Sequence, residues 1–173
     1  MRDFSPNHYE RAFANWLRDH NIRYVRSDEH KRPGPSDESL SVKNFDFLLL
    51  PSSQRRIIAE VKGRTFSGAS LAGLKGLECW VTTDDVKSLK VWKKALGPSH
   101  EAVFIFVYRM ARVDVDFDGH EPLDSGPDRY VFFCIRLEDY LRYRKRRSRK
   151  WRTVTLAAAD FRRHAVDLSA FLA

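Results

Sequence analysis

Apolar side chains recur every three or four residues near the start of the chain, at Tyr9, Phe13, Trp16 and Leu17. Side chains with that spacing share one face of a helix. Ser5 is a favourable N-cap, and Pro6 suits a first helical turn. We therefore predict an amphipathic helix from Pro6 to His20.

Short apolar or alternating runs further along the chain predict strands. The strands are expected at 22–26, 43–50, 55–62, 77–81, 102–109 and 130–136, with an edge strand at 153–156. Between them, helices are expected from Thr83 to the Gly97-Pro98 stop and over 137–144, and a short helix or an irregular cover over 160–172. Polar or glycine-rich loops are expected at 27–41, 63–76 and 118–128. This order of elements predicts an α/β fold with a central mixed β-sheet flanked by helices.

The chain has 173 residues, of which 43% are hydrophobic and 13% aromatic, which suits one folded domain. We expect a core at about 5–110 and a C-terminal extension over 111–173. The formal net charge is +8, and such an excess favours polyanionic partners, nucleic acid first. No apolar run approaches the roughly 20 residues that cross a bilayer, so we expect no membrane partner. Cys79 and Cys134 fit reduced core thiols of a cytoplasmic protein.

The strands expected at 43–50 and 55–62 carry Asp46, Glu60 and Lys62 beside apolar residues. Residues two apart on a strand share a face, so Glu60 and Lys62 project together. A hairpin-like connection brings Asp46 beside them. Magnesium prefers carboxylate oxygens with waters and substrate phosphate, and an ammonium group nearby stabilises charge on phosphorus. This pattern indicates metal-assisted phosphodiester hydrolysis, and a structural ion pair between Asp46 and Lys62 is the alternative.

Asp46 lies within an apolar and aromatic run, and Glu60-Val61-Lys62 follows fourteen residues later on an apolar strand. This Asp and Glu-x-Lys pattern resembles the motif of the PD-(D/E)xK nuclease superfamily. That superfamily includes restriction endonucleases, lambda exonuclease and archaeal Holliday junction resolvases. The resemblance covers residues 5–64 well and 84–109 as a pattern only. Asn44 and Phe45 precede Asp46, where a proline is nominal.

The resemblance implies a restriction-endonuclease-like three-layer core with a magnesium site, Mn²⁺ being a substitute. Asp46 and Glu60 would hold the metal, the backbone carbonyl of Val61 is a further ligand, and Lys62 would assist the attack. A glutamate on the preceding helix often completes such a site, and Glu10 matches that position. The alternative for Glu10 is a solvated helix face.

A basic segment follows at 142–152, where eight of eleven residues are Lys or Arg and two are aromatic. Phosphates attract such a run, and aromatic rings such as Tyr143 stack on exposed bases. The residues expected to bind nucleic acid are Arg64, Arg144, Lys145, Arg146, Arg147, Arg149, Lys150 and Trp151. The alternative is a solvated helix end and loop.

Together these features predict a metal-dependent nuclease, an endo- or exodeoxyribonuclease, that hydrolyses DNA phosphodiester bonds. A homodimer is compatible with this prediction, and so is RNA as the substrate. Two other functions stay open. One is a catalytically inactive nucleic-acid-binding protein on the same fold. The other is an interaction or assembly protein whose positive charge is incidental.

Overall fold

The computed structural model describes residues 7–27 and 42–173. The helices are α1 (His8–Asp19), α2 (Thr83–Leu96), α3 (Leu137–Tyr143), α4 (Ala158–His164) and α5 (Leu168–Leu172), with a 3-10 turn at Ala72–Leu74. The strands are β1 (Arg23–Arg26), β2 (Phe47–Leu50), β3 (Arg56–Phe66), β4 (Val81–Thr82), β5 (His100–Met110), β6 (Leu123–Ser125), β7 (Asp128–Arg136), β8 (Lys145–Ser148), β9 (Thr153–Thr155) and β10 (Val166–Asp167). The predicted loop over 27–41 lies, except for Ser27, outside the described residues.

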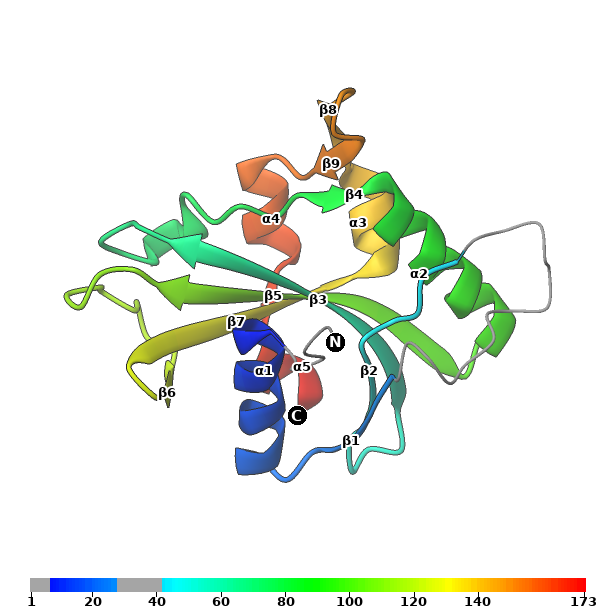
Figure 1. Cartoon of the computed structure of the whole chain (residues 1–173), viewed down its shortest axis with the longest axis horizontal. Coiled ribbons are helices and arrows are strands. Elements are labelled where there is room, and N and C mark those ends of the chain that lie inside the picture. Colours follow the sequence, from blue (N-terminus) through cyan, green and yellow to red (C-terminus); the bar gives the residue numbers. More distant parts are fainter. Residues whose placement is uncertain (1–6, 28–41) are drawn as a thin grey trace, which may run out of the picture.

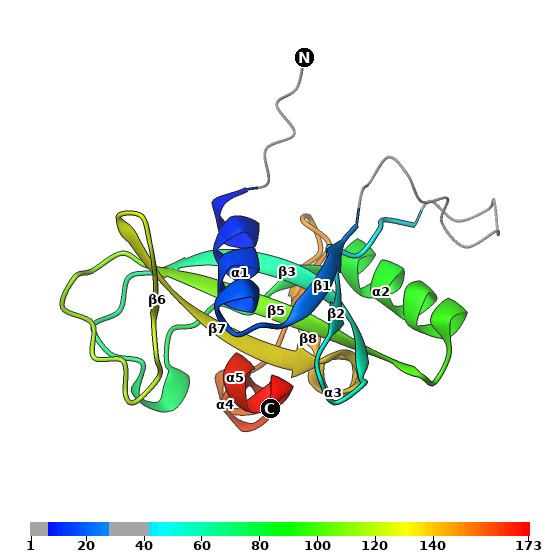
Figure 2. The ribbon, with the colours of Figure 1, turned by 90° about the horizontal axis from the view of Figure 1, so that it is seen from below.

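A mixed sheet of seven strands forms the middle layer, in the order β1-β2-β3-β5-β7-β10, with β6 paired to β7. Strands β3 and β5 are parallel, and the other neighbours in this sheet are antiparallel. Helices α1 and α5 lie on one face, and α2, α3 and α4 lie on the other (Figures 1 and 2). The predicted α/β fold with a helix-flanked mixed sheet is therefore confirmed.

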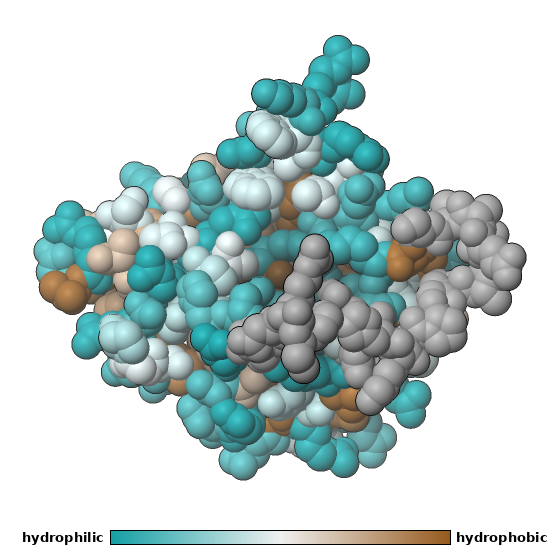
Figure 3. Space-filling view, viewed as in Figure 1, coloured by the Kyte–Doolittle hydropathy of each residue, from teal (hydrophilic) through white to brown (hydrophobic). Residues whose placement is uncertain are grey.

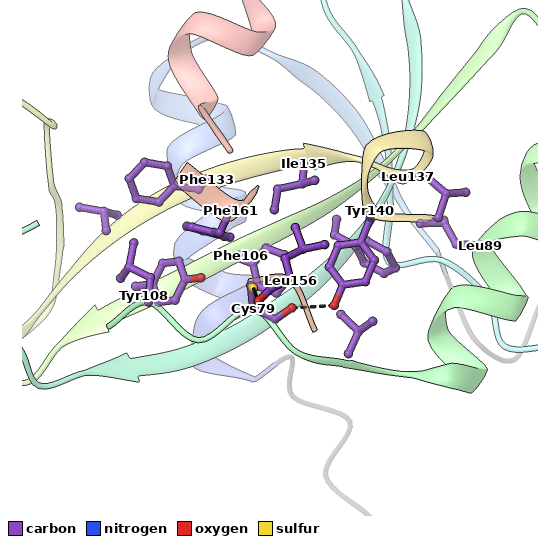
Figure 4. Close-up of a cluster of buried hydrophobic side chains, with 14 of the residues drawn as sticks. Cys79, Leu89, Phe106, Tyr108, Phe133, Ile135, Leu137, Tyr140, Leu156 and Phe161 are labelled. Carbon is purple, nitrogen blue, oxygen red and sulfur yellow. Dashed lines mark hydrogen bonds between the residues drawn. The ribbon is translucent and has the colours of Figure 1, made fainter. Parts of the chain in front are cut away.

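Side chains alternate between the two faces of the sheet, and each face has its own apolar core. Phe104 and Phe106 of β5 pack toward α2, α3 and α4, whereas Val103 and Ile105 pack toward α1. Figure 4 shows the first of these clusters, in which the Tyr140 hydroxyl donates to a backbone carbonyl. Strand β5 is buried on both faces, as its continuous apolar sequence predicts.

The start of α1 lies close against β3 because Gly63 has no side chain. A Cβ atom added at Gly63 would lie 2.1 Å from the ring of Tyr9. The prediction that residues 63–76 form a loop was wrong at its start, since β3 continues to Phe66 as a neighbour of β5. The helix begins at His8 with Asn7 as its N-cap. The predicted cap Ser5 lies outside the described residues.

The segment after residue 110 takes part in the central sheet through β7 and β10. It also forms most of a second, three-stranded sheet in the order β4-β9-β8. The predicted edge strand at 153–156 is β9, the middle strand of this second sheet. The basic segment at 142–152 starts with the last two residues of α3 and continues through β8 into a turn. Strands β8 and β9 pair as a β-hairpin that projects from the domain (Figure 1), where a loop was the alternative.

Candidate active site

Asp46 and Glu60 meet where β2 begins beside β3. The backbone N–H of Asp46 donates to the carbonyl of Ala59 over 3.0 Å, which extends the β2–β3 ladder by one residue. The Asp46 carboxylate then accepts a 2.7 Å hydrogen bond from the backbone N–H of Val61. Glu60 lies between Ala59 and Val61 and is 7% exposed. The antiparallel register therefore places two carboxylates from different strands side by side, as the sequence predicts.

Lys62 lies next to Glu60 on the same face of β3, also as predicted. Its ammonium group is 2.9 Å from the Glu60 carboxylate and 3.0 Å from the carboxylate of Asp85. Only 15% of the Lys62 side chain is exposed. Two buried carboxylates thus hold the ammonium group in one position, which a surface lysine would not have.

Asp85 and Lys43 complete this cluster, and sequence reasoning missed both. In the sequence, Asp85 is an acid in the first turn of the helix expected from Thr83, which predicts a cap and no chemistry. It does cap α2, through reciprocal hydrogen bonds with Thr82 of 2.9 and 3.1 Å. The same carboxylate lies 2.7 Å from the ammonium group of Lys43, which is 3.9 Å from that of Glu60. The first turn of α2 contains two acids, Asp84 and Asp85, whereas one is enough to cap the helix. The extra acid was the feature of the sequence that could have indicated a further role.

Burial dominates the electrostatics of the two strand carboxylates. It raises the pKa of Asp46 to about 8, with repulsion from Glu60 adding to the effect and the Val61 N–H opposing it. Burial also raises the pKa of Glu60, against the opposing charge of Lys62. For Asp85, burial acts in the same direction, but the positive charges of Lys62 and Lys43 prevail and lower its pKa. Asp46 and Glu60 are therefore carboxylates that a nearby cation would stabilise.

Glu10, from α1, approaches the same region from the other face of the sheet. Its negative charge contributes to the raised pKa of Asp46. Its carboxylate accepts hydrogen bonds of 2.8 Å from Arg26 and 2.8 Å from Asn7. The structure thus brings Glu10 into electrostatic range of Asp46 while Arg26 balances its charge.

A divalent cation fits the donor set of Asp46 and Glu60, because two carboxylates with a neighbouring backbone carbonyl are oxygen ligands that Mg²⁺ accepts. Across residues 7–27 and 42–173, no three His, Cys, Asp or Glu side chains are grouped so as to hold a metal ion by themselves. The ammonium groups of Lys62 and Lys43 lie among the carboxylates instead. Water and substrate phosphate would have to supply the remaining ligands.

Arg64 does not point outward as a phosphate contact would. Its guanidinium stacks on Trp80 at 3.9 Å and donates to the backbone carbonyls of Gly63 and Trp80. Burial lowers the pKa of Arg64. Arg147 stacks on Trp80 as well, at 5.0 Å, so these two arginines join the basic hairpin to β3.

The other basic residues predicted to bind nucleic acid are exposed on the hairpin: Arg144, Lys145, Arg146, Arg149 and Lys150. Trp151 lies at the turn between β8 and β9 and is 67% exposed. Tyr143 is different, because its ring stacks on His164 with centroids 4.4 Å apart. Cys79 and Cys134 are free and buried. Within the described part of the chain, no helix has the length and apolar character of a membrane span.

The sequence matches no family model and no curated protein. The structure is similar to that of Hjc from Archaeoglobus fulgidus, a Holliday junction resolvase from an archaeal hyperthermophile. The two chains are 12% identical, the match covers 97% of this chain and 100% of the resolvase, and the TM-score is 0.55. A likeness at this identity concerns the arrangement of helices and strands. The chain therefore has the restriction-endonuclease-like fold that its Asp and Glu-x-Lys strands indicate.

Proposed function

We propose that this protein is a magnesium-dependent nuclease that hydrolyses DNA phosphodiester bonds. The observation that carries the proposal is the meeting of Asp46, Glu60 and Lys62 at one point of a sheet with the resolvase-like fold. Two buried carboxylates with raised pKa values beside a fixed ammonium group do not favour stability in themselves. They do suit a reaction in which negative charge builds up on phosphorus.

In this proposal Asp46, Glu60 and the Val61 carbonyl hold the metal, and Glu10 supports Asp46 from α1. Bound magnesium would supply Lewis-acid stabilisation and a water of lowered pKa. Lys62 stays between Glu60 and Asp85 and presents its positive charge to the phosphate. Asp85 is a positioning residue, because it orients Lys62 and also fixes the first turn of α2 through Thr82.

The test is cleavage of labelled DNA, both linear and supercoiled, in Mg²⁺ and in EDTA. We expect Asp46→Ala and Lys62→Ala to lose cleavage, by at least the roughly 10²–10³-fold typical of one charge-stabilising group. Arg129→Ala is the matched control. Arg129 forms an exposed 3.0 Å ion pair with Asp124 on β6 and is outside the site. Undiminished cleavage in both site variants would refute the assignment.

One observation favours a second candidate, a nucleic-acid-binding protein without catalysis. Lys62 and Lys43 satisfy the buried carboxylates without a metal ion. In that case magnesium titrated into the protein would release no heat of binding. DNA would still bind, and its affinity would fall steeply with salt because the hairpin contacts are ionic.

A further inference from the structure

A basic groove lies between the β8–β9 hairpin and the start of α2. Its volume is about 450 Å³. The residues that line it include Thr83, Arg144, Lys145, Arg146, Arg149 and Arg152. Five of these side chains are cationic and none is acidic. Figure 3 shows that the projecting hairpin is hydrophilic.

Part of this positive charge is already used within the protein. Arg152 pairs with Asp84 at 3.1 Å, and Arg144 donates to the carbonyl of Leu141 over 2.6 Å. In contrast, the side chains of Lys145, Arg146 and Arg149 form no ion pair or hydrogen bond within residues 7–27 and 42–173. Three cations in a concave surface repel one another, and an anionic ligand removes that repulsion.

Trp151 lies on the turn of the hairpin, between Arg149 and Arg152 in the sequence, and both of these residues line the groove. Its backbone N–H donates to Ser148 over 3.1 Å, and the N–H of Arg152 donates to the carbonyl of Arg149 over 3.2 Å. The turn is therefore a closed structure that presents the indole ring to solvent. The Lys150 ammonium group lies 5.1 Å from the centre of the ring, and Trp151 is 67% exposed. An exposed aromatic ring on an ordered turn, close to cationic side chains, suits base stacking.

The groove and the candidate active site share the first turn of α2. Thr83 lines the groove, and its backbone N–H donates to the carbonyl of Arg152 over 2.8 Å. Asp84 pairs with the hairpin, and the next residue, Asp85, contacts Lys62. The first turn of α2 therefore connects the groove to the candidate active site.

We propose that the hairpin groove binds single-stranded DNA, with phosphates on Lys145, Arg146 and Arg149 and an unpaired base stacked on Trp151. This inference rests on the proposed nuclease function and adds that the substrate carries an unpaired stretch. A two-stranded β-ribbon also fits the major groove of a duplex. Here, however, the three cations without an intramolecular partner line a concave surface near an exposed indole ring, and that combination suits the phosphates and unstacked bases of a single strand.

The experiment measures binding in EDTA, without cleavage, by quenching of tryptophan fluorescence. The probes are an oligothymidine and a blunt duplex of equal nucleotide number. Trp16 and Trp92 are buried and Trp80 is covered by two arginines, so quenching reports Trp151. We expect the oligothymidine to bind at least tenfold more tightly than the duplex, with clear quenching.

The hairpin variants separate stacking from charge. Trp151→Ala should weaken oligothymidine binding roughly tenfold, as loss of one stacked base does, and Trp151→Phe should restore most of it. The double variant Arg146→Ala, Arg149→Ala should make binding less dependent on salt. The magnitude of the slope of log affinity against log salt should fall by about 1.4, because each lost phosphate contact to a single strand contributes about 0.7. The controls are Val113→Ala, which removes another exposed apolar side chain, and Arg129→Ala.

Equal affinity for duplex and oligothymidine, with no effect of Trp151→Ala, would overturn the inference and indicate a ribbon that enters a duplex groove. Absence of oligothymidine binding would overturn it as well. The two proposals fail separately. A wild-type protein that cleaves DNA but shows no single-strand preference contradicts only the groove. One that binds oligothymidine and cleaves nothing in Mg²⁺ contradicts the nuclease assignment.

Discussion

Replacing the candidate ligand Asp46 by asparagine should stabilise the metal-free protein. Asparagine has nearly the same shape, and its side-chain oxygen still accepts the hydrogen bond from the Val61 N–H. The substitution removes a carboxyl whose negative charge is unfavourable in this buried position beside Glu60. A residue held for binding a cation is expected to cost stability when the cation is absent.

The size of the effect follows from the pKa of Asp46, which is raised from 3.8 to about 8. Below about pH 4 the carboxyl is protonated in both the folded and the unfolded chain, and it costs nothing. As the pH rises toward 8, only the unfolded chain releases the proton, so stability falls by about 1.4 kcal/mol per pH unit. Neutral pH lies about three units above the ordinary pKa of 3.8, so we expect Asp46→Asn to gain about 2–4 kcal/mol there.

The assay is urea unfolding of both proteins in EDTA at about pH 4.5, 7 and 9, followed by circular dichroism. The two unfolding free energies should nearly coincide at the lowest pH and separate as the pH rises. Magnesium at about a hundredfold excess over its dissociation constant should stabilise the wild type by about 2.7 kcal/mol and the variant much less. If Asp46→Asn is less stable than the wild type at neutral and alkaline pH in EDTA, the electrostatic reasoning is wrong.

Three further substitutions test the fold around the site. Gly63→Ala should destabilise by about 1–3 kcal/mol in thermal unfolding, because its Cβ would lie 2.1 Å from the Tyr9 ring; unchanged stability would mean that α1 moves freely on β3. Tyr140→Phe should cost about 1–3 kcal/mol, since the buried Cys79 carbonyl loses its 2.7 Å hydrogen bond, and a neutral result in urea unfolding would contradict this. Asp85→Ala should reduce both stability and DNA cleavage. Asp85→Asn should recover more of the stability than of the cleavage, because the amide still caps α2 but carries no charge for Lys62. Equal recovery of stability and cleavage would argue against a positioning role.

Local patterns in the sequence were sufficient for the elements with strong periodicity or clear caps. Helix α2 starts at Thr83 and ends before Gly97 as predicted, because the acids at its start and the Gly-Pro stop are local signals. The run at 102–109 is the buried strand β5. The basic segment was harder, since a charged sequence has no apolar period that reveals a strand. Pairing with β9 makes it a hairpin.

Within the candidate site, too, some features follow from the local sequence and others depend on tertiary packing. The strands that bear Asp46 and Glu60-Val61-Lys62 show both kinds. The two-residue spacing in an extended chain determined that Glu60 and Lys62 share a face, and the apolar flanks indicated that Glu60 is buried and Lys62 largely covered. Asp85 and Lys43 join them only in the tertiary structure, since α2 crosses that face of the sheet. Strand periodicity acts between neighbours in the sequence, whereas contacts between residues distant in the sequence depend on how whole elements pack. The residue types thus indicated the kind of chemistry that we propose, and the packing of α2 and the β8–β9 hairpin decided which charges surround the candidate site.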